Sequence, residues 1–129
     1  MIIGAHVLLY SENPEADRAF FRDVLKFPYV EMGEGWLIFA LPPSEAAVHP
    51  IEGPNQPLLH ADHRLLGAVL YLMCSDLQEY INYLKSRNVS CTEITQAPWG
   101  IKTTIKLPSG SEMGLYQPTH PTALNLGKK

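Results

Sequence analysis

The stretches GAHVLLY (residues 4–10) and GAVLYLM (residues 67–73) decide the fold, because each opens one of two similar halves of the chain. Both stretches are apolar and rich in residues that favour β-strands. Each is followed by residues that favour the start of a helix, Asn13-Pro14 in the first half and the capping pair Ser75-Asp76 in the second. A strand that leads into a helix at the same point of both halves predicts one unit that occurs twice.

Apolar periodicity places one helix in each half. The first helix is expected over Pro14–Leu25, with a buried stripe made of Ala16, Ala19, Phe20 and Val24. The second is expected over Leu77–Ser86, where apolar residues recur at i, i+3, i+4 and i+7. These residues are Leu77, Tyr80, Ile81 and Leu84. Both helices are therefore expected to pack one face on a sheet.

Three segments that favour strands follow each helix. They are residues 29–32, 36–41 and 46–49 in the first half, and residues 91–95, 101–107 and 112–116 in the second. The order β-α-β-β-β is thus predicted twice, in units of about 4–50 and 67–118. The whole chain, residues 1–129, is predicted to be a single α+β domain.

The two units are expected to be joined by an irregular linker, because residues 50–66 contain prolines that cannot donate to a sheet ladder. These prolines are Pro50, Pro54 and Pro57. The tail, residues 118–129, is expected to form a peripheral arm.

Composition excludes several classes of protein. Hydrophobic residues make up 46% of the chain and charged residues 18%, which suits a folded domain. The net charge of −3 lacks the basic excess of nucleic-acid binders. The longest apolar run, residues 65–74, is about half of the roughly 20 residues that cross a bilayer. The start of the chain shows no signal-peptide pattern, so a cytoplasmic protein is expected. Cys74 and Cys91 lack a metal-binding spacing and are expected to be reduced thiols.

Paired units of this kind resemble the vicinal oxygen chelate superfamily, the group of glyoxalase I, bleomycin-resistance proteins and extradiol dioxygenases. The string EADRAFFRDVLKF (residues 15–27) is similar to that family's first helix and exit turn, and GLYQP (residues 114–118) to its closing strand. The resemblance spans His6 to Pro118. It implies two βαβββ units whose mixed, curved sheets line a cavity, either within one chain or across a homodimer.

The resemblance also implies where a metal would be held, on the first and last strands of each unit. His6 lies on the first strand of the first unit, and His49 closes its last strand. In the second unit Val69 stands where His6 would be, and Gly114 stands where the family places a glutamate. Glu112 shares a strand face with Gly114 and would complete a two-histidine, one-carboxylate set. Such a set suits a divalent metal, here Fe, Mn, Ni or Zn.

Each candidate also has an ordinary structural interpretation. His6 is then a core or pocket histidine whose hydrogen bonds are satisfied within the protein. His49 is then an exposed residue at a turn, and Glu112 a solvated residue after a turn. His60 and His63 have a spacing that would chelate a metal in a helix, but linkers often hold such residues without a function.

Alternation along the second unit's first strand places Val69, Tyr71 and Met73 on the cavity side. Tyr71, and Tyr10 in the first unit, are then polar groups in an apolar pocket. Trp36 and Trp99 stand at equivalent turns and suit either core packing or a cavity wall. The predicted substrate-binding residues are His6, His49, Tyr71 and Glu112, with no catalytic residue and no metal ligand assigned.

Three functions remain open on these residues. The first is a protein that binds a small molecule in a sheet-lined cavity without the full family metal site. The second is a divalent-metal-dependent lyase or dioxygenase acting on a small oxygenated or aromatic substrate, and the third is a relic sheet used for association or regulation. The missing ligands in the second unit favour the first. The expected partners are a small molecule and a second copy of the chain, since a small curved domain leaves edges to cover; nucleic acid and membranes are not expected.

Overall fold

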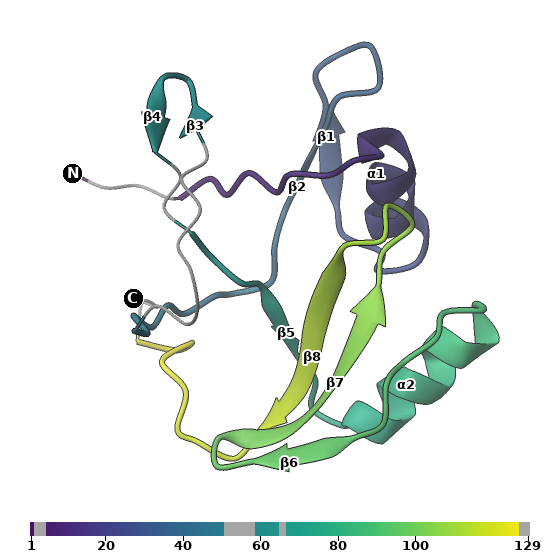
Figure 1. The fold of residues 1–129 in the computed structure, drawn as a ribbon, viewed down its shortest axis with the longest axis vertical. Helices are drawn as coiled ribbons and strands as arrows, with labels where there is room; N and C mark the ends of the chain where they lie inside the picture. The colour runs from purple at the N-terminus through teal and green to yellow at the C-terminus, as the bar shows by residue number, and fades with distance from the viewer. Residues whose placement is uncertain (2–4, 51–58, 65–66, 127–129) are drawn as a thin grey trace.

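The second unit forms a complete βαβββ layer in the computed structural model, which describes residues 1, 5–50, 59–64 and 67–126 (Figure 1). Its strands are β5 (Tyr71–Met73), β6 (Thr95–Ala97), β7 (Gly100–Lys106) and β8 (Glu112–Pro118), and its helix is α2 (Leu77–Ser86). The sheet order is β5-β8-β7-β6, with β5 parallel to β8 and the other neighbours antiparallel. This is the mixed sheet predicted for the second half, although the expected strand over residues 91–95 is reduced to a bridge at Cys91, and β6 begins at Thr95.

Helix α2 packs on this sheet through the face that the sequence predicts. Leu77, Ile81 and Leu84 are buried, with exposed fractions of 0%, 3% and 0%. The helix begins at the N-cap Asp76, whose Oδ1 accepts a hydrogen bond from the Glu79 amide at 3.1 Å. Its bounds coincide with the predicted range because both capping and apolar spacing are local signals.

The first unit begins with helix α1 (Pro14–Asp23), capped by Asn13, whose side chain accepts from the Ala16 amide at 3.2 Å. The helix ends two residues earlier than predicted. Its buried residues are Asp17, Phe20 and Phe21. The predicted stripe is therefore confirmed only at Phe20, while Ala16, Ala19 and Val24 are partly exposed.

An aromatic contact explains why the buried face of α1 is rotated from the predicted stripe. Phe21 packs edge-on against Phe27 and Phe39, with ring centroids 5.7 and 5.5 Å away. Phe39 lies on β2 (Leu37–Phe39), which pairs with β1 (Tyr29–Glu31) as an antiparallel hairpin. The large apolar area of Phe21 thus outweighs that of the two alanines.

The first unit lacks two of its predicted strands. Residues 5–10 and 46–49 lie outside any strand and are exposed, and Gly4 lies outside the described residues. Val48 is fully exposed, at 102%. The pair β1–β2 forms a two-stranded sheet of its own. A strand needs a neighbouring strand to accept and donate its backbone hydrogen bonds. Because these segments have no such neighbour among the described residues, their β-propensity alone did not make them strands.

The linker is partly ordered as a small hairpin, so the prediction that it is irregular is wrong for residues 59–64. Strands β3 (Leu59–His60) and β4 (His63–Arg64) pair antiparallel. The two turn residues between them, Ala61 and Asp62, have φ values of +48° and +66°. Positive φ at both positions is typical of a tight two-residue hairpin turn. Residues 51–58 and 65–66 lie outside the described part of the chain.

Hydrogen bonds between distant residues join α1 to the second unit. The buried carboxylate of Asp17 accepts from the Ser109 amide at 3.0 Å and from the Ser109 hydroxyl at 2.7 Å. The Tyr83 hydroxyl of α2 donates to the Val24 carbonyl at 2.7 Å. Because Asp17 and Tyr83 hold opposite ends of α1, the helix is fixed in position against the second unit.

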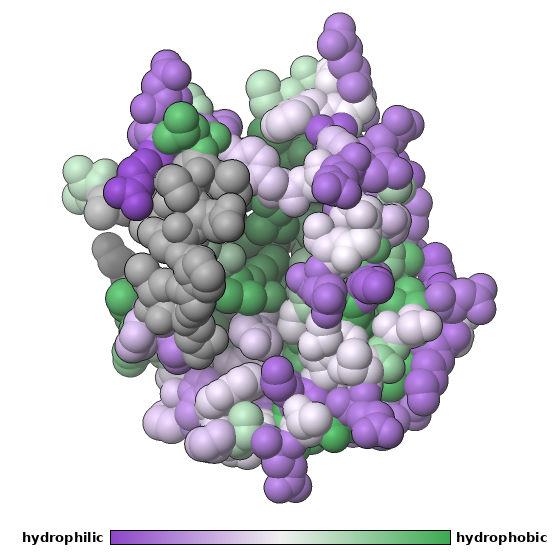
Figure 2. All heavy atoms as spheres, in the orientation of Figure 1, coloured by the Kyte–Doolittle hydropathy of each residue, from purple (hydrophilic) through white to green (hydrophobic). Residues whose placement is uncertain are grey.

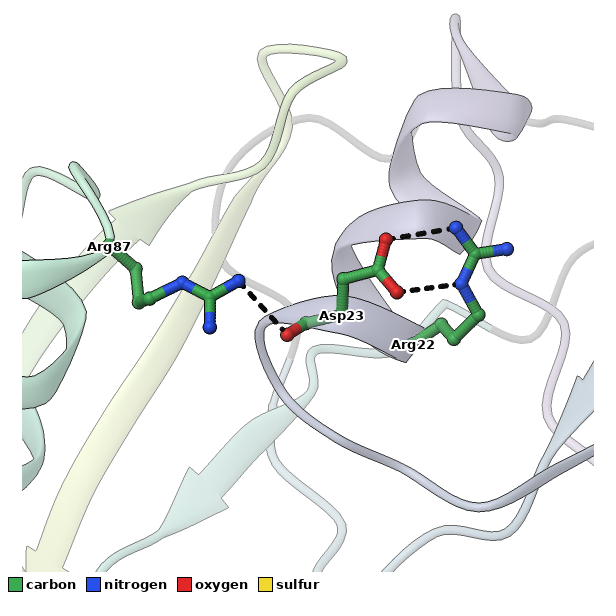
Figure 3. A network of polar contacts seen from close by, with 3 residues as sticks. All are labelled: Arg22, Asp23 and Arg87. Atoms are coloured by element: carbon green, nitrogen blue, oxygen red, sulfur yellow. Dashed lines mark hydrogen bonds and ion pairs between the residues drawn. The ribbon is translucent and has the colours of Figure 1, made fainter.

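A further contact lies at the exposed end of α1 (Figure 3). Arg22 forms a bidentate pair with the neighbouring Asp23, at 2.7 and 2.9 Å. Arg87, at the end of α2, donates to the Asp23 backbone carbonyl at 3.3 Å. The ion pair raises the pKa of Arg22 and lowers that of Asp23, but exposed pairs of this kind contribute little to stability.

In the orientation of Figure 2, hydrophobic side chains are visible at the back of a hollow near the middle of the molecule, and hydrophilic side chains dominate the outline. No helix among the described residues is long and apolar enough to cross a membrane.

Candidate functional site

The sheet of the second unit has an open face on the side away from α2. Leu72, Ile105 and Leu115 belong to the core packed with α2. Alternation along the strands turns Tyr71 and Tyr116 to the opposite face. There they meet Trp99, and we call these three residues, Tyr71, Trp99 and Tyr116, the aromatic cluster.

The three rings of the aromatic cluster contact one another edge to face. Ring centroids are 5.6 Å apart for Tyr71 and Trp99, 5.8 Å for Tyr71 and Tyr116, and 5.2 Å for Trp99 and Tyr116. This geometry stabilises each pair by about 0.5–1.5 kcal/mol beyond area burial. Tyr116 is 7% exposed and forms the floor, whereas Tyr71 is 39% exposed and reaches solvent. The cluster is thus a preformed aromatic surface in which Tyr71 is exposed and Trp99 partly exposed.

Gly114 allows the Tyr71 ring to lie directly on the sheet. The two residues are partners in the β5–β8 register. A Cβ added to Gly114 would lie 2.2 Å from Cδ1 and Cε1 of Tyr71, which no real contact permits. The ring therefore fills the space at the position where the resemblance places a carboxylate ligand.

Tyr116 is also held by a polar network on this side of the sheet. Its hydroxyl lies 2.9 Å from Nε2 of His120, and the two rings stack with centroids 5.8 Å apart. Nδ1 of His120 lies 2.8 Å from the Pro121 carbonyl. Because a carbonyl only accepts, Nδ1 of His120 carries a proton and donates to the Pro121 carbonyl. Burial, and secondarily the charge of Glu45, raises the pKa of Tyr116, which keeps it a neutral phenol.

The tail, predicted to be a peripheral arm, is hydrogen-bonded into this network, although most of residues 119–126 are exposed and Pro118 ends β8. The Thr119 amide donates to the Trp99 carbonyl at 3.0 Å. Glu45 Oε1 accepts from the Ala123 amide at 2.7 Å, and its Oε2 lies 4.0 Å from Nε2 of His120. Sequence reasoning missed Glu45 and His120. The only signal was the position of His120 just after the closing strand.

The other predicted site residues lie outside the aromatic cluster. His6 is exposed in the extended segment before α1. His49 is exposed, with Nδ1 2.7 Å from the Pro50 carbonyl. Glu112 is exposed at the start of β8, opposite Lys106 on β7. Of the four predicted binding residues, only Tyr71 takes part in the cluster.

These residues do not form a metal centre. Within the part of the chain that the structure describes, no three His, Cys, Asp or Glu side chains are grouped so as to hold a metal ion. His6, His49 and Glu112 are all described, and the structure does not bring them together. The donor set of the metal-dependent hypothesis therefore does not fit a divalent ion.

The remaining candidates have structural roles. His60 and His63 face each other across the β3–β4 hairpin with ring centroids 6.0 Å apart, and Tyr10 packs on His60 at 5.8 Å. Trp36 lies at the β1–β2 turn with the Arg18 guanidinium 4.7 Å from its ring. Of the two equivalent tryptophans, Trp99 thus belongs to the aromatic cluster and Trp36 does not.

Neither cysteine is an activated nucleophile. Cys74 and Cys91 are free thiols. Burial raises the pKa of Cys74 to about 11 and also raises that of Cys91, an effect that Lys85 opposes. Because the thiolate is the reactive form, these shifts disfavour nucleophilic reactivity at both thiols.

No family model and no curated protein matches this chain. Solved structures do match it in fold. Lactoylglutathione lyase from Agrobacterium tumefaciens aligns with a TM-score of 0.59 and 17% identity, covering 89% of this chain and 92% of that one. TnmS3, an antibiotic binding protein from Streptomyces sp. CB03234, aligns with a TM-score of 0.53 and 16% identity over 92% and 100% of the two chains.

A virulence protein from Salmonella typhimurium aligns with a TM-score of 0.51 and 20% identity, covering 92% of this chain and 100% of that one. These similarities confirm the predicted resemblance at the level of the fold, which this chain shares with a lactoylglutathione lyase and an antibiotic binding protein. The fold hosts both an enzyme and a binding protein, so it does not decide between these functions.

Proposed function

We propose that the protein binds a flat, aromatic small molecule on the open face of its second sheet, without a metal centre. The observation that carries the proposal is the aromatic cluster, in which the Tyr71 ring lies on Gly114 and is 39% exposed. Preformed rings that present one accessible face, with few polar groups, are typical of small-molecule sites. That TnmS3, with the same fold, is an antibiotic binding protein supports this function.

Each member of the site has a role in this proposal. The rings of Tyr71 and Trp99 stack on the ligand. The buried ring of Tyr116 contacts both of these rings and supports them. The Tyr71 hydroxyl makes no hydrogen bond to any described residue and is free to bond a polar group of the ligand. Lys102 lies on the same face as its register partner Tyr116 and adds a positive charge at the edge of the site.

The alternative function, a divalent-metal-dependent lyase or dioxygenase, has less support. Its donors His6, His49 and Glu112 are not grouped, and the Tyr71 ring occupies the space beside Gly114. The cytoplasmic location and the lack of nucleic-acid and membrane partners stay predictions from the sequence.

Tyr71→Ala tests the proposed site, with 2-naphthol as the probe. Loss of one stacking partner is expected to weaken binding by roughly two- to twelve-fold, the equivalent of about 0.5–1.5 kcal/mol. Calorimetric titration gives the dissociation constant, and the NMR signal of the Trp99 indole N–H reports whether the probe reaches the cluster.

Tyr29→Ala is the matched control, because Tyr29 is similarly exposed, at 46%, but lies on β1. It should leave the affinity for 2-naphthol unchanged. Equal affinities of the wild type and Tyr71→Ala, or an equal loss in both variants, would contradict a site at the aromatic cluster.

We further propose that the protein is a homodimer. Val7, Leu8, Leu9 and Tyr10 form an apolar segment in which each side chain is 47–55% exposed. The segment has no ladder partner among the described residues. An exposed apolar segment with unpaired backbone is a template for pairing with another chain. A second copy would cover it, and a standard interface would bury roughly 1,200–2,000 Å² in total.

The double variant Val7→Lys/Leu9→Lys is expected to convert the dimer to a monomer, because it places two charges in the buried interface. Sedimentation equilibrium at micromolar concentration should give twice the 14.4 kDa chain mass for the wild type and the single mass for the variant. Val30→Lys, at another exposed valine, on β1, should stay dimeric. A wild-type protein that sediments at 14.4 kDa would disprove the dimer.

A further inference from the structure

A cavity lies on the α2 side of the molecule, where the first unit meets α2. Its volume is about 550 Å³, within the usual range for small-molecule sites. The first unit contributes Phe27 and Pro42, and α2 contributes Glu79, Tyr80 and Tyr83. No member of the aromatic cluster lines it. The cavity is therefore separate from the site proposed above.

Aromatic rings make up much of the wall of this cavity. Tyr80 and Tyr83 lie with ring centroids 5.5 Å apart and planes tilted by 36°. The hydrogen bond from the Tyr83 hydroxyl to the Val24 carbonyl fixes one of the rings in place. Phe27 adds a third ring from the other side. The lining thus includes three aromatic rings, one of which is held in place by a hydrogen bond.

The charge of the lining is negative. Asp76 and Glu79 are its acidic residues, and none of the described residues that line the cavity is basic. Burial raises the pKa of Cys74 to about 11 and that of Tyr80 to about 12, so both are neutral at physiological pH. The N-terminus of α2 contributes only about half a positive charge. Two carboxylates outweigh it.

We propose that this cavity binds a small organic cation, an amine or quaternary ammonium group carried on an apolar body. The cation would lie near the carboxylates and against the tyrosine rings, whose faces attract positive charge. The apolar body would contact Phe27 and Leu72. An anion of the same shape would meet repulsion from Asp76 and Glu79 and is expected to be rejected.

The probe for this site is benzyltrimethylammonium, with benzylsulfonate as the anion of similar shape. Titration of the ¹⁵N-labelled protein is expected to shift the amide signals of residues 74–80 with the cation and to leave them unchanged with the sulfonate. Equal binding of both probes, or shifts confined to the aromatic cluster, would overturn the proposal.

Glu79→Gln and Tyr80→Leu are each expected to weaken binding of the cation by roughly two- to thirty-fold. Glu93→Gln is the control, because Glu93 is an exposed acid that does not line the cavity. It should leave the affinity unchanged, as should Tyr71→Ala. Unchanged affinity in both Glu79→Gln and Tyr80→Leu would overturn the proposal. The affinity of Glu79→Gln for 2-naphthol reports independently on the aromatic cluster.

Discussion

Gly100→Ala should lower the free energy of unfolding by about 3 kcal/mol or more, because backbone strain and a backbone clash act together at this position. Gly100 has a φ of +152°, which residues with a side chain rarely adopt. An added Cβ would lie 2.3 Å from the Gln117 carbonyl oxygen and 3.1 Å from Cα of Pro118. Both atoms belong to the backbone of β8, the strand paired with β7. The clash can be relieved only by moving the strands apart. Urea unfolding followed by circular dichroism measures the loss.

Gly110→Ala is the matched control for this prediction. Gly110 also has a positive φ, +94°, but an added Cβ meets nothing within 4 Å. Its cost should be that of strain alone, about 1–2 kcal/mol. Equal losses in the two variants would show that β8 moves aside without penalty, and the clash would then have no energetic weight.

Pairing partners explain which parts of the fold were predictable from the sequence. In the second half, α2 and the last two strand segments form where the sequence predicts them, and each strand has a neighbour. In the first half the same strand-forming pattern occurs at residues 5–10, yet no neighbouring strand pairs with it within the described chain. The β-propensity of a segment indicates that it favours an extended backbone. It becomes a strand only when it pairs with a neighbouring strand.

The candidate site was predictable only where local alternation decides it. Tyr71 was placed on the open face by period-two alternation from Val69, and the structure places its ring there, on Gly114. Glu45 and its partner in the tail, Ala123, are 78 residues apart in the sequence. Spacing carries no information about a contact of that range. The network around Tyr116 therefore required the three-dimensional structure.

The same limit applies to buried polar residues. Asp17 lies on the predicted first helix, but its charge gave no reason to bury it. Its carboxylate is buried because Ser109, in the turn before β8, supplies two hydrogen-bond donors. A charged residue on an apolar helix face thus marks a partner elsewhere in the chain, which the sequence does not identify.

Leu84→Ala should lower the free energy of unfolding by about 2–5 kcal/mol, since it deletes buried groups and leaves a cavity. Leu84 is 0% exposed, within the cluster that joins α2 to the sheet. Leucine and alanine both favour helices, so helix propensity does not account for a loss. Urea unfolding at one protein concentration measures the change. Lys85→Ala, at the next and exposed position of α2, is the control and should change stability by no more than about 0.5 kcal/mol. A similarly small effect of Leu84→Ala would mean that α2 does not pack on the sheet through this face, and the division of the second unit into a helix-covered face and an open, ligand-binding face would fail with it.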